Sequence, residues 1–150
     1  MADIKSSEER SINMSKIRSK DTKPEEYIRK LLYTNGYRYR KNVNYIVGSP
    51  DIWLSRYNTA VFVNGCFWHR HEGCKYAYTP KTRVDFWIKK FNMNVERDKK
   101  VREVLRDSNI RVLIIWECTV KRMMKSVDIQ NDFMNRIHDF IRTECEYREI

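Results

Sequence analysis

The sequence has none of the features that direct a protein into or across a membrane. No apolar run approaches the roughly 18 residues that a membrane-spanning helix needs. The first residues, MADIKSSEER, contain neither an apolar core nor a cleavage site, so no signal peptide is predicted. We therefore expect a cytoplasmic protein with no membrane partner.

The sequence also lacks internal repeats and linker-like stretches, and it has only four glycines and three prolines. Its 150 residues fit one domain, and a chain of this length buries roughly two-thirds of its unfolded surface. We therefore expect a single domain over residues 1–150 whose core needs no disulfide bonds. In a reducing compartment, clustered cysteines indicate a metal site instead.

Acidic residues are scarce, with 20 Asp and Glu against 30 Lys and Arg, and the net charge is +10. A field of this strength favours polyanionic partners, nucleic acid before an anionic membrane surface, although a basic surface can also serve solubility alone. The charge is uneven: residues 81–102 hold eight Lys or Arg against three acids, and residues 16–30 hold six against three. Basic helices are often only solvated faces, but two such segments favour contacts with phosphate.

The clearest predicted helix lies within the segment DTKPEEYIRKLLYTNG, residues 21–36. Thr22 can be its N-cap, Pro24 falls in the first turn, and Glu25 stands three residues after Thr22, as in a capping box. Gly36 ends it. Glu25 can therefore be a capping residue with no further role.

Hydrophobic periodicity predicts the other elements. The predicted strands are 37–45, 51–57, 59–65 and 110–118, and the predicted helices are 82–107, 127–143 and, more weakly, 7–19. A short polar turn at 56–58 makes the second and third strands an antiparallel hairpin, and the apolar strand 110–118 is typical of burial on both faces. This order predicts an α/β fold with a mixed sheet covered by helices on both faces, and an acidic, peripheral tail at 143–150.

The segment FVNGCFWHRHEGC, residues 62–74, gathers cysteine and histidine in a C-x4-H-x2-C pattern. Cys66, His71 and Cys74 can converge on one tetrahedral ion, and a structural zinc needs a fourth ligand. Cys118, at the end of the buried strand, can supply it; Cys145, in the tail, is the weaker candidate. The alternative is a set of unconnected core cysteines and surface histidines.

A loop pinned by zinc would display the residues between its ligands. Phe67, Trp68 and His69 are not ligands by spacing, so the metal would serve to aim them. The alternative is that the two aromatic side chains belong to the core and that the histidine lies on the surface.

Asp51 follows Pro50 and begins a predicted strand. A carboxylate at a strand end can hold Mg²⁺, which keeps waters and takes phosphate oxygens from a substrate. The acidic-x-Lys triplet that often follows on the next strand is missing, because Val61, Phe62 and Val63 occupy that place. Alone, an Asp after Pro is usually a turn residue.

Five segments in this order, RSINMSKIRSKDTKPE, SPDIWL, VFVNGCFWHRH, FWIKKFNMNVERD and RVLIIWEC, together resemble the very-short-patch repair endonucleases over roughly residues 10–120. These are bacterial DNA mismatch nickases with a restriction-endonuclease-like fold. The resemblance therefore implies such a fold with a structural zinc site, double-stranded mismatched DNA as the partner, and zinc and magnesium as the metals.

The resemblance also implies roles for individual residues. Asp51 corresponds to the magnesium ligand, with Val63 adding its backbone carbonyl; His69 corresponds to the histidine that activates water or transfers a proton, and Glu25 to a supporting glutamate. The implied zinc ligands are Cys66, His71, Cys74 and Cys118. The implied DNA contacts are Phe67, Trp68 and Trp87, which wedge into the base stack, together with Met14 in an N-terminal arm or helix over 1–20, and Lys90, Asn94 and Arg97 beside Asp98.

One position departs from the family. A second histidine usually precedes the Gly-Cys pair, and this chain has Asn64 there. An amide can donate a hydrogen bond to phosphate, but it cannot act as a base at neutral pH. We assign Asn64 to the catalytic group, and the lack of a base at this position can lower the rate of cleavage. Trp87, at helical spacing from Val84 and Phe91, can equally be a core residue.

These observations predict a monomeric, Mg²⁺-dependent and zinc-stabilised endonuclease that nicks one strand beside a T·G mismatch, the product of 5-methylcytosine deamination. It would act on the nucleoid in the bacterial cytoplasm. The alternatives are a restriction-type nuclease of the same fold with another target, a zinc-stapled module that binds mismatches with impaired catalysis, and a purely structural zinc protein.

Overall fold

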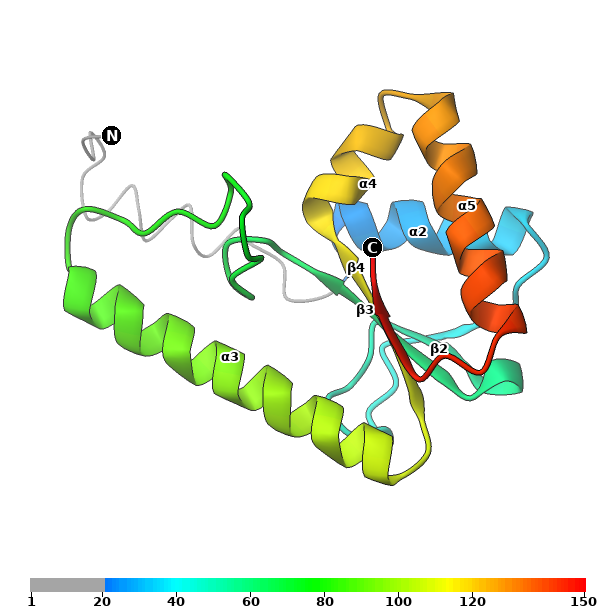
Figure 1. The fold of residues 1–150 in the computed structure, drawn as a ribbon, viewed down its shortest axis with the longest axis horizontal. Coiled ribbons are helices and arrows are strands. Elements are labelled where there is room, and N and C mark those ends of the chain that lie inside the picture. Colours follow the sequence, from blue (N-terminus) through cyan, green and yellow to red (C-terminus); the bar gives the residue numbers. More distant parts are fainter. Residues whose placement is uncertain (1–20) are drawn as a thin grey trace.

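The structure, a computed structural model, describes residues 21–150 as a five-stranded mixed sheet with helices on both faces (Figure 1). The helix predicted over 7–19 and the predicted DNA contact Met14 lie outside the described residues. None of the helices within residues 21–150 is long and apolar enough to cross a membrane.

Helix α2 (Lys23–Thr34) begins where the sequence predicts. The Thr22 hydroxyl accepts a hydrogen bond from the backbone N–H of Glu25 at 3.4 Å, and Pro24 stands in the first turn. Ile28 and Leu32, four residues apart, are almost fully buried and fix the face that packs on the sheet. The predicted N-cap is therefore confirmed.

The sheet has the order β1-β2-β3-β4-β5. Its strands are β1 (Arg40–Lys41), β2 (Ile52–Leu54), β3 (Thr59–Asn64), β4 (Arg111–Trp116) and β5 (Tyr147–Glu149). The first three are antiparallel neighbours, whereas β4 runs parallel to β3 and β5 parallel to β4. The predicted hairpin is confirmed, with a 3-10 turn (Ser55–Tyr57) between β2 and β3.

Two cores lie on the two faces of the sheet because successive residues of a strand point to opposite sides. Val61 and Leu113 face α2, α4 (Glu117–Met123) and α5 (Val127–Arg142). Their neighbours Ala60 and Val112 face the C-terminal half of α3 (Val84–Asp107). In Figure 1, α3 lies on one side of the strands and the other three helices lie on the opposite side.

Helix α3 covers the range predicted for it, but most of its apolar residues stay partly exposed. Phe91 and Leu105 are buried, whereas Phe86 and Val95, both in the N-terminal half, remain at least 45% exposed. The reason is that the N-terminal half of α3 extends beyond the sheet, beside the loop that follows β3 (Figure 1). The burial of apolar side chains in this half of α3 therefore depends on contacts with that loop.

Two sequence predictions need correction, and one helix was not predicted. The strand predicted over 37–45 is reduced to Arg40–Lys41, whose side chains are exposed and offer no apolar face. The short helix α4 was not predicted. The tail over 143–150 is not peripheral, because β5 pairs with β4 and Ile150 is only 9% exposed. An edge strand pairs on one side only, so it tolerates charged residues. Because of these charged residues, β5 lacks the apolar pattern by which a strand is recognised in a sequence.

Arg111 fastens this tail to the rest of the molecule. Its guanidinium donates to the carbonyl of Cys145 at 2.9 Å, to that of Thr143 at 3.1 Å and to that of Phe140. It thereby satisfies carbonyl groups at the end of α5 that have no partner within the helix. These hydrogen bonds hold the segment between the end of α5 and the start of β5.

Candidate active site and metal centre

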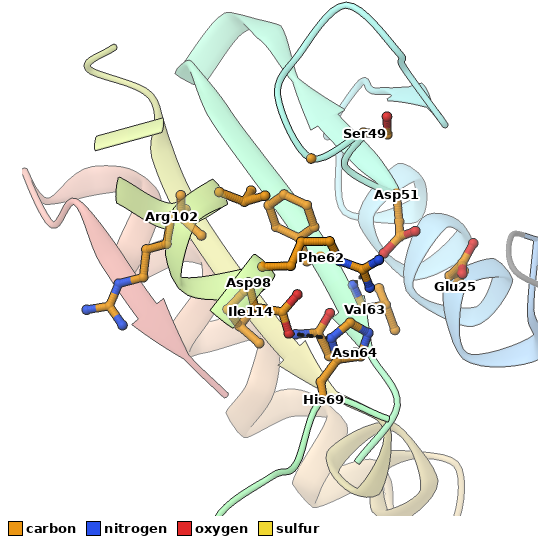
Figure 2. A pocket seen from close by; sticks show the side chains of 14 residues that line it. Glu25, Ser49, Asp51, Phe62, Val63, Asn64, His69, Asp98, Arg102 and Ile114 are labelled. Carbon is orange, nitrogen blue, oxygen red and sulfur yellow. Dashed lines mark hydrogen bonds and ion pairs between the residues drawn. The ribbon is translucent and has the colours of Figure 1, made fainter. Parts of the chain in front are cut away.

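A cavity of about 440 Å³ opens where α2, β3 and α3 approach one another. Figure 2 shows the predicted catalytic residues around it: Glu25 from α2, Asp51 just before β2, Asn64 from the end of β3 and His69 from the following loop. Val63, predicted to bind magnesium through its carbonyl, and Asp98 from α3 lie there too. Residues predicted from four separate segments of the sequence therefore share one cavity.

Asp51 is held by the strand beside it. Its Oδ2 accepts a hydrogen bond from the backbone N–H of Val63 at 2.8 Å. Burial and, second to it, the charge of Glu25 raise the pKa of Asp51 to about 7, although the Val63 N–H, Arg29 and His69 act against the rise. A carboxylate in such a position is stabilised as an anion by a cation beside it, which fits a magnesium ligand.

Arg29, which was not predicted from the sequence, links the Glu25 carboxylate to the backbone carbonyl of Asp51. Its Nη2 donates to Glu25 Oε2 at 3.2 Å, to Asn42 Oδ1 at 3.2 Å and to the Asp51 carbonyl at 3.3 Å. Its Nη1 lies 2.7 Å from Asp21 Oδ1. Burial raises the pKa of Glu25, whereas the Asp21 backbone N–H and Arg29 oppose this. The capping residue of α2 is thus also part of the cavity wall.

His69 is oriented by Asp98. The Nδ1 atom of His69, on the loop after β3, lies 2.6 Å from the Oδ2 atom of Asp98, on α3. A carboxylate accepts hydrogen bonds, so Nδ1 carries the proton and Nε2 of the neutral ring is left with the lone pair. Asn64, only 9% exposed, lies beside this pair in Figure 2. The pair has the geometry of a proton acceptor with a fixed tautomer.

The four predicted metal ligands form a second group next to this cavity. The ligand atoms of Cys66, His71, Cys74 and Cys118 all lie within 4.8 Å of one another. His71 Nδ1 lies 3.6 Å from the sulfur of Cys66 and 3.4 Å from that of Cys118. This Cys₃His group can hold a tetrahedral metal ion.

The parallel pairing of β3 and β4 explains how distant cysteines meet. Asn64 pairs with Trp116, and Cys66 and Cys118 each follow two residues later at the same edge of the sheet. Cys118 lies in the first turn of α4 rather than in the strand. Burial raises the pKa of Cys66 to about 12, so its thiolate needs a cation beside it. Within the described residues, Cys145 is not part of the group and donates to the Tyr147 carbonyl.

Trp116 supports the metal group from beneath. Its ring stacks on His71 with centroids 4.2 Å apart and planes 7° apart. Its indole N–H donates to Glu149 Oε1 at 2.9 Å, a residue of the edge strand β5. The tail that the sequence analysis assigned to the periphery therefore reaches the surroundings of a metal ligand.

Aromatic side chains cluster between the metal-bearing loop and the first half of α3. The Phe67 ring lies 5.0 Å from Trp68, 5.6 Å from Trp87 and 5.1 Å from Phe91, measured between centroids. Tyr78 adds a contact to Phe67 at 5.2 Å. The structure thus unites the three predicted wedge residues and adds two that were not predicted for this role.

The remaining predicted DNA contacts on α3 differ in position. Lys90 and Arg97 are exposed, and Arg97 lines the mouth of the cavity. Asn94 is buried, and its Nδ2 donates to the Trp68 carbonyl at 3.1 Å. The observed contact of Asn94 is therefore with the aromatic loop, which it ties to the helix.

Asp51→Asn is expected to raise thermal stability at about pH 8 without divalent ions, because it removes a buried charge but keeps an acceptor for Val63. The raised pKa means that protonated Asp51 contributes stability below the unfolded value near 3.8, and that this contribution is lost as pH rises through about 7. Melting curves should show a gain of about 3 °C or more at the higher pH, shrinking towards about pH 4.

Added Mg²⁺ supplies the control for this measurement. It should stabilise the wild-type protein and leave Asp51→Asn unchanged, because only the wild type offers a carboxylate ligand. A variant no more stable than the wild type at the higher pH would show that burial does not penalise the Asp51 charge.

Comparisons with known proteins identify the family of this chain. The family model "DNA mismatch endonuclease Vsr" matches residues 2–75. The type II nicking enzyme V.NmeAIP of Neisseria meningitidis is 43% identical over 94% of this chain and 100% of its own length. The DNA mismatch endonuclease Vsr of Escherichia coli is 38% identical over 85% of this chain and 81% of its own. The chain therefore belongs to the Vsr family of DNA mismatch endonucleases, and it is a DNA endonuclease.

Proposed function

We propose that this protein is a Mg²⁺-dependent endonuclease that nicks one DNA strand beside a T·G mismatch, as in the repair of deaminated 5-methylcytosine. The observation that carries the proposal is that one loop bears both His69, which lines the same cavity as Asp51, and the aromatic residues Phe67 and Trp68. The histidine that transfers the proton and the aromatic residues that recognise the mismatch would then lie at a fixed distance from each other. The mixed sheet with helices on both faces supports a restriction-endonuclease-like fold.

Proton transfer is assigned to His69. Nε2 of the neutral ring would take a proton from the attacking water, and Asp98 would stabilise the imidazolium that forms. Asn64 can donate a hydrogen bond from its amide to a phosphate oxygen, but it cannot replace a base. These residues all belong to this chain, and the acid–base step proposed for them needs no second subunit, so we propose a monomer.

Magnesium is assigned to the carboxylate side of the cavity. Asp51, with Glu25 nearby and the backbone carbonyl of Val63, would hold the ion, because Mg²⁺ prefers oxygen ligands and keeps several waters. When bound, Mg²⁺ would neutralise charge that develops on the phosphate. Arg29 donates to the Glu25 carboxylate and to the backbone carbonyl of Asp51, so it ties the Glu25 side chain to the backbone that carries Asp51.

DNA binding is assigned to the basic surface and to the aromatic cluster. Lys90 and Arg97, together with the basic N-terminal arm that contains Met14, would supply phosphate contacts and hold the duplex. Phe67, Trp68 and Trp87 would enter the base stack. A T·G pair stacks poorly, so separating its neighbours costs less than the few kcal/mol of a normal step. The substrate would place the protein at the nucleoid in the cytoplasm.

Zinc is assigned to the Cys₃His group, and we expect about one equivalent per chain. Metal analysis of protein purified without added zinc is the measurement, and Cys118→Ser should lower the content because it removes one sulfur ligand. Cys145→Ser is the matched control and should change nothing, since its thiol lies outside the group. Less than about half an equivalent in folded wild-type protein would contradict the assignment.

Trp68→Ala is expected to reduce the preference for T·G over paired duplexes by about tenfold, because one stacked aromatic is worth roughly 1–3 kcal/mol. Affinity for the paired duplex should change little, since it comes from charge. Equilibrium binding to both duplexes measures this. Tyr33→Ala, an exposed aromatic on α2, is the control and should alter neither affinity. Equal losses on both duplexes would make Trp68 a core residue.

Asn64 favours one second candidate, a mismatch-binding module with impaired catalysis. This candidate predicts binding to T·G duplexes without cleavage in Mg²⁺. The restriction-type alternative predicts cleavage of paired duplexes at another target. The nicking measurement described at the end of the Discussion separates the three.

A further inference from the structure

Arg70 makes an unusual set of contacts for a residue on an exposed loop. Its Nη1 donates to the carbonyls of Phe67 at 3.2 Å and Tyr78 at 3.0 Å. Its Nη2 donates to the carbonyl of Ala77 at 2.7 Å and to the hydroxyl of Thr79 at 3.3 Å. One guanidinium therefore bridges the loop that carries the wedge residues and the segment that follows the metal ligand Cys74.

The face of the same guanidinium is also occupied. Its carbon lies 3.8 Å from the centroid of the Phe91 ring on α3, and 5.8 Å from that of Phe67. With Nη1 and Nη2 already bonded to protein oxygens, this side chain has few donors left for a phosphate.

The segment that Arg70 holds has few other contacts; at its start, Lys121 Nζ lies 4.4 Å from the centroid of the Tyr76 ring. Residues 75–83 form no helix or strand. In the part of the chain that the structure describes, one backbone hydrogen bond holds residues 75–80, from the Ala77 N–H to the Cys74 carbonyl. Yet this segment places the Tyr78 ring 5.2 Å from Phe67. Arg70 is therefore the main connection that keeps Tyr78 against the aromatic cluster.

We propose that Arg70 is a positioning residue for mismatch recognition: it clamps residues 77–79 against Phe67 and so holds Phe67 and Trp68 in the orientation that enters the base stack. The proposal rests on the proposed function. An aromatic side chain discriminates between stacks only if it is held rigidly before binding, since a mobile side chain loses entropy on every duplex. A planar fork with several donors performs this task, and a lysine ammonium does not.

The test compares three variants on a T·G duplex and on the paired duplex of the same sequence, without Mg²⁺. Arg70→Met keeps the apolar stem and removes the fork, and Arg70→Lys keeps the charge. Arg83→Met is the matched control, because Arg83 is exposed on the same segment and its guanidinium rests on Phe86 at 4.3 Å. It removes the same charge without touching the clamp.

We expect Arg70→Met to lower the preference for T·G by about tenfold, while its affinity for the paired duplex stays within about twofold of Arg83→Met. Arg70→Lys should lose most of the preference and keep the wild-type affinity for paired DNA. Equal losses on both duplexes, with a flatter salt dependence, would overturn the proposal by showing that Arg70 contacts phosphate. An unchanged preference in Arg70→Met would also overturn it.

Limited proteolysis tests, in the absence of DNA, whether Arg70 holds residues 77–79 in place. Trypsin should cut after Lys75 and Lys81 faster in Arg70→Met than in the wild type or Arg83→Met, whereas zinc content should remain the same. Equal cleavage rates would show that no clamp exists. A wild type without any preference for T·G would defeat the proposed function itself, an outcome distinct from a wild-type preference that survives in Arg70→Met.

Discussion

Asp51→Ala is expected to abolish nicking, with a loss of about a thousandfold or more in single-turnover rate, and to leave DNA affinity within about threefold. Asp51 is the buried carboxylate that a cation would stabilise, and its oxygen is fixed by the Val63 N–H at 2.8 Å. Binding should survive because phosphate contacts come from other residues. Quenched-flow cleavage and gel-shift binding on one T·G duplex measure both quantities.

Glu25→Gln is the companion variant. It keeps the size of the side chain and its contact with Arg29 but removes a charge beside Asp51, so it should slow nicking less than Asp51→Ala does. If Asp51→Ala cleaves within about tenfold of the wild type, Asp51 does not hold the catalytic metal.

His69→Ala is expected to slow nicking by about 10²–10⁴-fold, the usual worth of a positioned acid or base. Its ring is the one imidazole that lines the cavity described here, and Asp98 fixes its tautomer at 2.6 Å. Single-turnover rates at saturating enzyme measure the loss without interference from binding. Retained activity would leave the chain without an identified base.

Two further variants show which groups assist His69. Asp98→Asn should lower the rate less than His69→Ala, because the ring remains but its imidazolium loses a neighbouring charge. Asn64→His should change the rate by less than about thirtyfold, within the range of one hydrogen bond to a charged group. A thousandfold gain in Asn64→His would instead favour the mismatch-binding module with impaired catalysis.

Much of the site was predictable because its signals are local in the sequence. Three metal ligands lie within nine residues, Cys66 to Cys74, and helix α2 carries its start signal in Thr22 and Glu25. The fourth ligand, Cys118, was predictable because a buried apolar strand leads to it. Parallel pairing of that strand with β3 then brings the ligands together.

The parts that were missed depend on tertiary packing. A Glu and an Arg four residues apart on a helix are usually a solvent-exposed pair, so nothing local distinguishes the buried pair Glu25 and Arg29. The polar Asn94 turns inward only because the aromatic loop needs a donor for its carbonyl. Strand β5 is short and charged, and only its pairing with β4 reveals it.

The proposed function requires this chain to cleave DNA in response to a mismatch, through a site built around Asp51. It is tested most directly by a nicking assay with each strand labelled in turn, on T·G and paired duplexes of one sequence, in Mg²⁺ and in EDTA. We predict cleavage of one strand of the T·G duplex in Mg²⁺ alone. Equal cleavage of the paired duplex, or no cleavage of a T·G duplex that the protein binds, would contradict the claim.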